Sequence, residues 1–315
     1  MREYILRRLL SMIPVLLVVS VIAFGLLYIL PGDPALAILG ENAGNQETYR
    51  ALRREMGLDD PVYVQYARWL SRVVQGDLGK SVRTGEPVGV VLMRRVPVSL
   101  YYGFAGMLVG MLIGFPVAII SALKPGSRLD IAGTIAAMSG VAIPSFWEAL
   151  LFVYVFAVLL RWLPPSGYTP PGQDPVLSLK MLIMPAIVLG THSAAVLMRQ
   201  GRSALIEVLE QDYIITARAK GLRERLVINR HAVKNAMIPV VTILGLQVGH
   251  LVSGAAITET VFAIPGVGRA AVDAIFFRDY PMLQGAVLML TLAAMIGNLL
   301  ADLAYAYLDP RIRYR

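Results

Sequence analysis

The 315-residue sequence contains no cysteine and only three histidines. The absence of cysteine excludes disulfide bonds, thiol nucleophiles, iron–sulfur clusters and cysteine-based zinc sites, and three histidines are few for a metalloenzyme. Charged residues are also scarce: they make up 16% of the chain, where a soluble domain carries roughly a quarter. Because 57% of the residues are hydrophobic, the composition places the chain in a membrane, and we expect no metal site.

Six segments are long and apolar enough, or nearly so, to cross the hydrocarbon core of a bilayer, which is roughly 30 Å thick and takes about 20 residues of helix. The sequence therefore predicts an all-α membrane protein with six transmembrane helices in a single domain, residues 1–315. The first segment is too long for the apolar core of a signal peptide, so we interpret it as an uncleaved span. The six predicted spans are residues 9–30, 96–123, 131–160, 181–198, 236–258 and 281–301.

The basic residues give these spans an orientation. With the N-terminus inside, 16 of the 29 lysines and arginines lie in inside segments, and two lie in each short outside loop. The other nine lie in the long outside segment 31–95, where Arg94 and Arg95 run against the positive-inside rule, which counts short loops most heavily. Cytoplasmic loops carry the excess of basic residues in membrane proteins, so both termini are predicted to be cytoplasmic. The formal net charge of +8 then faces an anionic leaflet, which accounts for it without nucleic acid as a partner.

The longest outside segment, residues 31–95, is predicted to hold short helices joined by turns. Asn45 and Asp60 are placed to cap two helices, which end at Gly57 and Gly76. A stripe on the second helix either packs on neighbouring helices or lipid, or offers a docking platform to an external partner. Its members recur at helical spacing: Val62, Tyr66, Trp69 and Val73.

The tripeptide Gly79–Lys80–Ser81 matches the last three residues of the phosphate-binding P-loop motif. That motif needs a glycine five residues before its second glycine, and position 74 is a valine. We therefore interpret the tripeptide as a turn, and the sequence holds no nucleotide site here.

The inside segment 199–235 carries eight basic residues but also has helical signals. Asp212 is placed to cap a short helix over 213–220 that ends at Gly221, and a second helical stretch follows over 222–235. Such a helix–glycine–helix elbow could bind a partner as a rigid unit. Glycine suits the turn, since only glycine takes a positive φ at no cost. A solvated basic loop is the alternative.

The run DYIITARAKGL at 212–222, followed by RHAVKNAMIP at 230–239, resembles the coupling loop of binding-protein-dependent ABC importer permeases. The likeness is greatest to the dipeptide, oligopeptide and nickel branch. Of the general EAA pattern of that superfamily, Ala217 and Gly221 match. Further motifs of the branch follow in its order: PGDP at 31–34, GLD at 57–59, GDLG at 76–79, LPPSGY at 163–168, PGVG at 265–268, RDYP at 278–281 and DPR at 309–311.

The resemblance implies one permease subunit of an ATP-driven importer in a bacterial or archaeal plasma membrane, and it sets the expected partners. These are a second, homologous permease, two cytoplasmic ATPases that hold the ATP and magnesium, and an external solute-binding protein. This chain is then not an enzyme and carries no cofactor. The expected solute is a short peptide, with glutathione, a nickel complex or a haem-like ligand as alternatives.

The resemblance also assigns residues to the coupling loop. Apolar contacts to an ATPase groove would come from Tyr213, Ile214, Ala217 and Leu222, and ion pairs from Arg218 and Lys220. Gly221 would form the elbow. The full set expected to couple the subunit to its ATPase is Asp212, Tyr213, Ala217, Arg218, Lys220, Gly221 and Leu222.

Glu148 is the one formally charged residue well inside a predicted span. Burying a charge there costs about 2.5 to 3.5 kcal/mol, so such residues are functional candidates. Gln247, His250 and Thr258 are polar candidates on the predicted fifth span. We expect these four residues to line the solute path; hydrogen-bonded packing between helices is the alternative.

Small residues and prolines mark the helix contacts. Three glycines on the second span and Gly245, Gly249 and Ser253 on the fifth have the spacing that lets helix backbones approach closely. The contact lies within this subunit or, for the fifth span, at the other permease. Prolines are expected to kink or interrupt three spans. The glycines of the second span are Gly106, Gly110 and Gly114, and the prolines are Pro116, Pro144 and Pro185.

An ion-coupled secondary transporter is the main alternative function. Such proteins use coupling carboxylates near the membrane midplane and often an inverted repeat. This chain has one such carboxylate and no visible repeat.

The topology can be tested by labelling, since the chain has no cysteine of its own. We expect a single cysteine placed at position 70 to react with an impermeant reagent from outside, and one at position 225 only from the cytoplasm. The opposite pattern at either position would rule out the six-span arrangement.

Overall fold

The computed structural model describes residues 2–29, 35–36, 46–248 and 255–308. Within these ranges the chain is helical, and the one β-type pairing is an isolated bridge between Lys80 and Pro87. The predicted all-α membrane class is confirmed. Four of the described helices are long and apolar enough to cross a membrane: α1 (Arg2–Ile29), α5 (Val88–Leu123), α8 (Pro175–Leu209) and α14 (Tyr280–Leu308).

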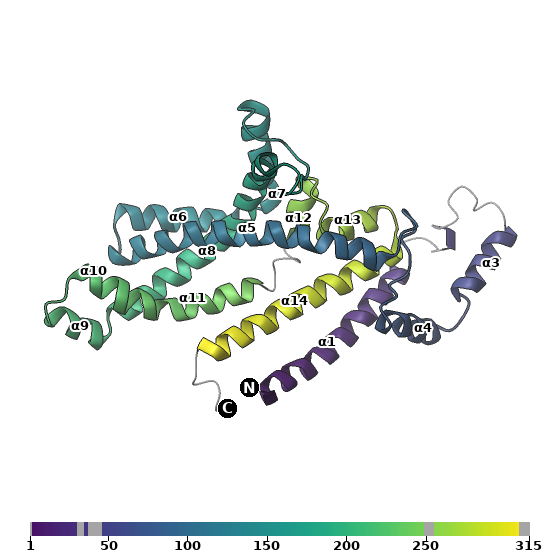
Figure 1. The fold of residues 1–315 in the computed structure, drawn as a ribbon, viewed down its shortest axis with the longest axis horizontal. Helices are drawn as coiled ribbons and strands as arrows, with labels where there is room; N and C mark the ends of the chain where they lie inside the picture. Colours follow the sequence, from purple (N-terminus) through teal and green to yellow (C-terminus); the bar gives the residue numbers. More distant parts are fainter. Residues whose placement is uncertain (1, 30–34, 37–45, 249–254, 309–315) are drawn as a thin grey trace.

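The predicted third span is two helices rather than one. The chain bends by 104° between α6 (Arg128–Ala142) and the pair α7 (Ser145–Phe152) and η2 (Val153–Leu159), of which η2 is π-helical. Pro144 explains the break, because proline lacks an N–H and forces the residue before it into an extended conformation. Ile143 has φ −77° and ψ 123°. In Figure 1, α7 accordingly stands out from the other helices.

The helices α5 and α8 remain continuous through Pro116 and Pro185, so neither proline interrupts its span. Of the predicted fifth span, residues 236–248 belong to α11 (Val233–Val248), and residues 249–254 lie outside the described part. His250, Gly249 and Ser253 fall there. With four long apolar helices described, or five if the bent pair is one span, the six-span topology stays a prediction.

The most extensive helix contact joins α5 and α8, which lie side by side in Figure 1. The glycines of α5 allow it: a Cβ atom at Gly106 would lie 2.5 Å from the Leu189 Cβ, and one at Gly110 would lie 2.5 Å from the Ser193 Cβ. Close packing at these glycines is thus confirmed, and it lies within this chain. Gly245 similarly faces α14, where its added Cβ would lie 3.0 Å from the Ala301 Cβ.

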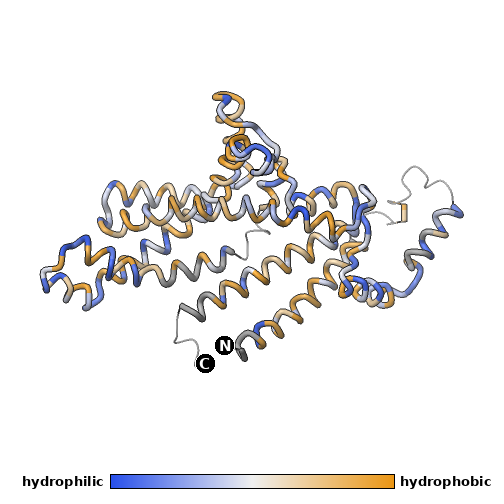
Figure 2. The backbone as a smooth tube through the Cα atoms, in the orientation of Figure 1, coloured by the Kyte–Doolittle hydropathy of each residue, from blue (hydrophilic) through white to orange (hydrophobic). Residues whose placement is uncertain are grey.

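The polar parts of the molecule lie at its two ends. In Figure 2 hydrophilic residues gather around α9 and α10 at one end and around α3 and α4 at the other, with apolar helix between them. The second end holds the predicted outside segment, and the first holds the predicted coupling loop. The bounds of these helices are α3 (Gln46–Met56), α4 (Val62–Val74), α9 (Asp212–Ala219) and α10 (Glu224–Leu226).

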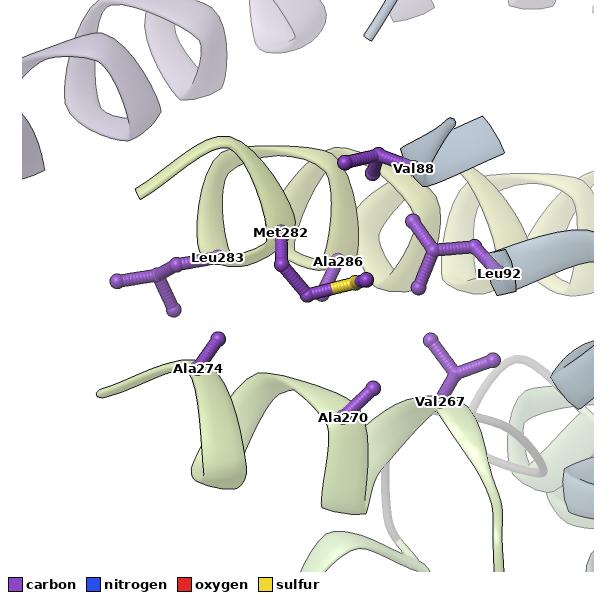
Figure 3. Packing of buried hydrophobic residues seen from close by; sticks show 8 residues of the cluster. All are labelled: Val88, Leu92, Val267, Ala270, Ala274, Met282, Leu283 and Ala286. Atoms are coloured by element: carbon purple, nitrogen blue, oxygen red, sulfur yellow. The ribbon is translucent and has the colours of Figure 1, made fainter. Parts of the chain in front are cut away.

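An apolar cluster joins the starts of α5 and α14 to α13, and Figure 3 shows its members. The short α13 (Val267–Phe276) places small alanines against α14, so the two helices pack closely. The buried cluster consists of Val88, Leu92, Val267, Ala270, Ala274, Met282, Leu283 and Ala286.

The segment predicted to lie outside packs against the bundle. The Tyr66 hydroxyl lies 2.8 Å from the Ser20 Oγ, and the rings of Tyr66 and Trp69 contact Phe24. For these two residues the packing interpretation of the α4 stripe is confirmed. The turn predicted at Gly79–Lys80–Ser81 is wrong: Lys80 forms the isolated bridge with Pro87, and the turn follows at residues 82–84. The buried Ser81 hydroxyl donates to the Asp279 carboxylate.

The helix ends in this segment were predicted in part. Gly57 and Gly76 have φ of +65° and +84° and follow α3 and α4, as expected. The capping role predicted for Asp60 is wrong: Pro61 precedes α4 with no side-chain cap, and the Asp60 carboxylate instead pairs with Arg68 at 2.9 Å. Asn45 lies outside the described residues.

The α5–α8 contact gives a stability prediction. Gly110→Ala should destabilise the protein by about 1–3 kcal/mol, because Ser193 must move to admit the new Cβ. Gly25→Ala on α1 is the matched control, since no atom lies within 4 Å of the added Cβ. The thermal midpoint of each variant in detergent measures this. A Gly110→Ala midpoint equal to that of the control would show that α5 and α8 are not in close contact.

Candidate functional site

A cavity of about 670 Å³ lies where α5, α6, α7, α8, α11 and α12 (Ala256–Val261) meet. Three of the four predicted path residues line it: Glu148 from α7, Gln247 from α11 and Thr258 from α12. His250 lies outside the described residues. The wall is otherwise mostly apolar, and its polar side chains are Ser145, Glu148, His192, Ser193, Gln247 and Thr258.

Three consecutive residues of α8 organise this cavity. The Thr191 hydroxyl donates to the Glu148 Oε1 at 2.7 Å, and the Ser193 hydroxyl donates to the Gln247 Oε1 at 2.8 Å. His192, between them, lines the cavity itself. Sequence reasoning missed this triplet, although a polar Thr–His–Ser inside the apolar run 181–198 is a readable signal.

Beside the cavity, Glu259 is a fully buried carboxylate. It accepts hydrogen bonds from the Ser99 hydroxyl at 2.6 Å and from the Arg269 backbone N–H at 2.9 Å. Ser99 in turn accepts from the Val267 N–H at 2.9 Å, and a Cβ at Gly266 would overlap the carboxylate. Glu259 therefore fastens α12 and the start of α13 to α5.

The predicted fifth span stops at Thr258, so the sequence places Glu259 in the predicted outside loop. Its partners come from residues 160 positions earlier and ten positions later in the chain. No local pattern in the sequence signals that pairing.

At the end of the bundle predicted to be cytoplasmic, a second buried carboxylate joins α6 to α8. The Arg202 guanidinium binds Asp130 through two bonds, of 2.6 and 2.7 Å. The Gly126 N–H donates to the same carboxylate at 2.8 Å, and Ser127 caps α6. Because paired, hydrogen-bonded geometry offsets the cost of desolvating the charges, this group can hold the two helices together.

The coupling loop forms the predicted elbow, with two differences. The helix α9 begins at Asp212 itself, so Asp212 does not cap it; Gln211 precedes the helix and makes no side-chain cap. The fourth predicted span is also longer, because α8 continues to Leu209 and leaves only Glu210 and Gln211 as a link. Gly221 ends the turn with φ +76°, which confirms the predicted left-handed conformation.

One face of α9 packs on the chain itself. Ile214 and Ala217 are buried against Leu205, Val227 and Ala232, where the last two belong to η3 (Val227–Ala232). Ile214 and Ala217 therefore pack inside this subunit, and their contact with an ATPase stays a prediction. The predicted residues that remain exposed are Asp212, Tyr213, Arg218, Lys220, Gly221 and Leu222.

The expected ion pair of Arg218 is intramolecular. Its guanidinium donates to both carboxylate oxygens of Glu224, at 2.7 and 3.2 Å, across the Gly221 turn. These hydrogen bonds lower the pKa of Glu224. The Asn235 side chain also donates to the Tyr213 hydroxyl at 3.0 Å. Both contacts hold α9 against the segment that follows it.

Comparison with known proteins identifies the family. Residues 114–314 match the family described as binding-protein-dependent transport system inner membrane component, and residues 1–102 match the N-terminal part of the same kind of component. The chain belongs to this family. It is a permease subunit of an ABC importer and a multi-pass protein of the bacterial plasma membrane. Membership decides against an ion-coupled secondary transporter.

Curated relatives align with essentially the whole chain. A dipeptide transport system permease protein, DppB, of Alkalihalophilus pseudofirmus is 39% identical over 335 residues, covering all of both chains. A putative peptide permease protein of Brucella suis is 43% identical and covers 99% of each chain. The oligopeptide transport system permease protein AppB of Bacillus subtilis is 38% identical and covers all of both.

Solved structures share the fold. An inward-facing conformation of the MetNI methionine ABC transporter superposes with a TM-score of 0.57 at 17% identity, covering 70% of this chain and 96% of that one. An amino acid ABC transporter gives a TM-score of 0.50 at 13% identity, covering 70% and 94%. The described helices thus form a type I ABC importer transmembrane fold.

The buried Glu259 gives a prediction. Glu259→Gln should lower stability by about 1–3 kcal/mol, because the amide turns a donor toward either the Ser99 hydroxyl or the Arg269 N–H. The control Glu86→Gln removes an exposed ion pair with Arg94 and should cost no more than about 1 kcal/mol. Thermal midpoints in detergent compare the two. Equal midpoints would mean that Glu259 does not hold α12 to α5.

Proposed function

We propose that this subunit forms, together with a second homologous permease, the membrane path for short peptides that an external binding protein delivers. Two cytoplasmic ATPases supply the energy, and ATP and magnesium bind to them rather than to this chain. The observation that carries the proposal is the polar cavity among apolar helices, where Glu148, Gln247 and Thr258 meet. Peptide as the solute rests on the names of the full-length relatives; glutathione, a nickel complex or a haem-like ligand are the other solutes considered.

A second permease fits the exposed side of the cavity. Ser145 and His192 line the cavity and are also solvent-exposed in this subunit. Large apolar side chains of α7 and η2 are exposed beside them, including Phe146 at 49% and Trp147 at 48%. Exposed apolar side chains in a membrane can face lipid, but an ionisable residue such as His192 at membrane depth faces protein or a water-filled cavity. The partner permease would complete the wall of the path and cover this surface.

In this proposal, the coupling loop transmits motion to the cavity. The helix α8 runs without a break from Thr191 to Leu209, which is about 27 Å at the rise of an α-helix. The link of Glu210 and Gln211 then leads directly into α9. A displacement of α9 by an ATPase would therefore move the residues that position Glu148 and Gln247.

The exposed part of the elbow is the surface we assign to the ATPase. Its apolar members are Tyr213, Ile215 and Leu222, which are 42%, 56% and 38% exposed. Lys220 adds a positive charge, while Arg218 is held by Glu224. Asp212 is the first residue of α9, and Gly221 lies in the turn that follows the helix. The buried Ala217 packs α9 against the rest of this chain.

Reconstitution tests the proposal. In vesicles that contain both permeases, the ATPases and the binding protein, uptake of a labelled dipeptide should require ATP and should persist when a protonophore removes the proton gradient. In the same assay, Gly221→Val should lower both ATPase co-purification and uptake several-fold. The reason is that valine at φ +76° costs of order 1–3 kcal/mol of local strain, which redirects α9.

Gly85→Val is the matched control for Gly221→Val. Gly85 has φ +72° and, like Gly221, no atom within 4 Å of an added Cβ, but it lies in the predicted outside segment. Its ATPase co-purification should equal that of the unsubstituted protein. If Gly221→Val kept full co-purification and uptake, the elbow would not be the coupling surface.

A further inference from the structure

The charge on the described wall of the cavity is negative. Among the described residues that line it, Glu148 is the sole carboxylate, and there is no lysine or arginine. The other polar lining groups are serine and threonine hydroxyls, the His192 imidazole and the Gln247 amide. An anionic carboxylate in a cavity with low-dielectric walls attracts cations and repels anions.

The carboxylate of Glu148 is held in position. Thr191 donates to its Oε1 at 2.7 Å, so the carboxylate is already oriented before a solute binds. Glu148 also lies in the first turn of α7, three residues after Ser145, which lines the same cavity. The two side chains share one helix face.

We propose that Glu148 makes this cavity selective for solutes that carry a cationic ammonium group, such as the free amino terminus of a peptide, and against anionic solutes. An ammonium group offers three N–H donors and no acceptor, which complements a carboxylate that only accepts. The hydrogen bonds formed are charge-assisted and therefore among the stronger ones in proteins. The inference rests on the proposed function, because it assumes that the solute passes through this cavity.

Gln247 extends the recognition to the group next to the ammonium. Its Oε1 accepts from Ser193, which leaves its amide N–H groups as donors at the cavity wall. The first carbonyl of a peptide is an acceptor, so the two residues together complement an amino terminus followed by a peptide bond. A solute whose amino group is acylated lacks the cationic part of this pattern.

A single cysteine at Ser145 measures the selectivity directly, because the chain has no other cysteine. In the assembled complex with cysteine-free partners, Ser145→Cys is treated with a trimethylammonium-ethyl or a sulfonatoethyl methanethiosulfonate. The ratio of the cationic to the anionic rate is compared with that in Ser145→Cys with Glu148→Gln. We expect the ratio to fall on the order of tenfold when the carboxylate is removed.

The control combines Ser145→Cys with Glu207→Gln, which removes an exposed carboxylate in the last turn of α8, far from the cavity. This change should leave the ratio as it is. An equal ratio with and without Glu148 would overturn the proposal. If Glu148→Gln fails to assemble, the ratio at Ser145→Cys is compared with that at Ser166→Cys, an exposed position outside the cavity, with Glu148 intact. A higher ratio at position 145 supports the proposal, and equal ratios overturn it.

Dipeptide uptake separates this inference from the proposed function. Uptake is measured after the cysteine at position 145 has been modified in the complex. Blocked uptake together with an unchanged rate ratio would leave the path in place and overturn only the charge selectivity. Full uptake after complete modification would show that the solute does not pass this cavity, and both proposals would fall.

Discussion

The close approach of α5 and α8 is the constraint on which the rest of the structure depends. Inside a bilayer there is little hydrophobic drive between helices, so contact area and backbone proximity carry the association. Gly106, Gly110 and Gly114 supply that proximity by leaving no side chain between the two backbones. The contact fixes α8, and α8 in turn carries the hydroxyls that hold Glu148 and Gln247 at the cavity.

Buried carboxylates fasten the ends of this central pair. Asp130 with Arg202 joins α6 to α8, Glu259 with Ser99 joins α12 to α5, and Asp279 with Ser81 joins the turn before α5 to the start of α14. Each carboxylate receives more than one hydrogen bond. A partly satisfied buried charge would cost more than an apolar contact, so these groups can specify one arrangement of helices that apolar packing alone would leave open.

The sequence predicted the features that arise from local patterns. The length of the apolar segments predicted the helical membrane class, and Gly221 predicted the turn after α9. Polar residues inside apolar segments predicted three of the residues that line the cavity. It did not give what depends on distant partners. Glu259 and Ser99 are 160 residues apart, and Asp130 and Arg202 are 72 apart. The buried face of α9 was also missed, because Ile214 and Ala217 fit a partner's groove and this chain's own core equally well.

The spacing of Thr191 and Ser193 has a mechanical consequence. Residues two positions apart on an α-helix point about 200° apart around its axis, so these hydroxyls hold α7 on one side of α8 and α11 on nearly the opposite side. A rotation of α8 about its own axis must disturb both hydrogen bonds together. Such a rotation would therefore act on α7 and α11 at the same time, and so on both Glu148 and Gln247.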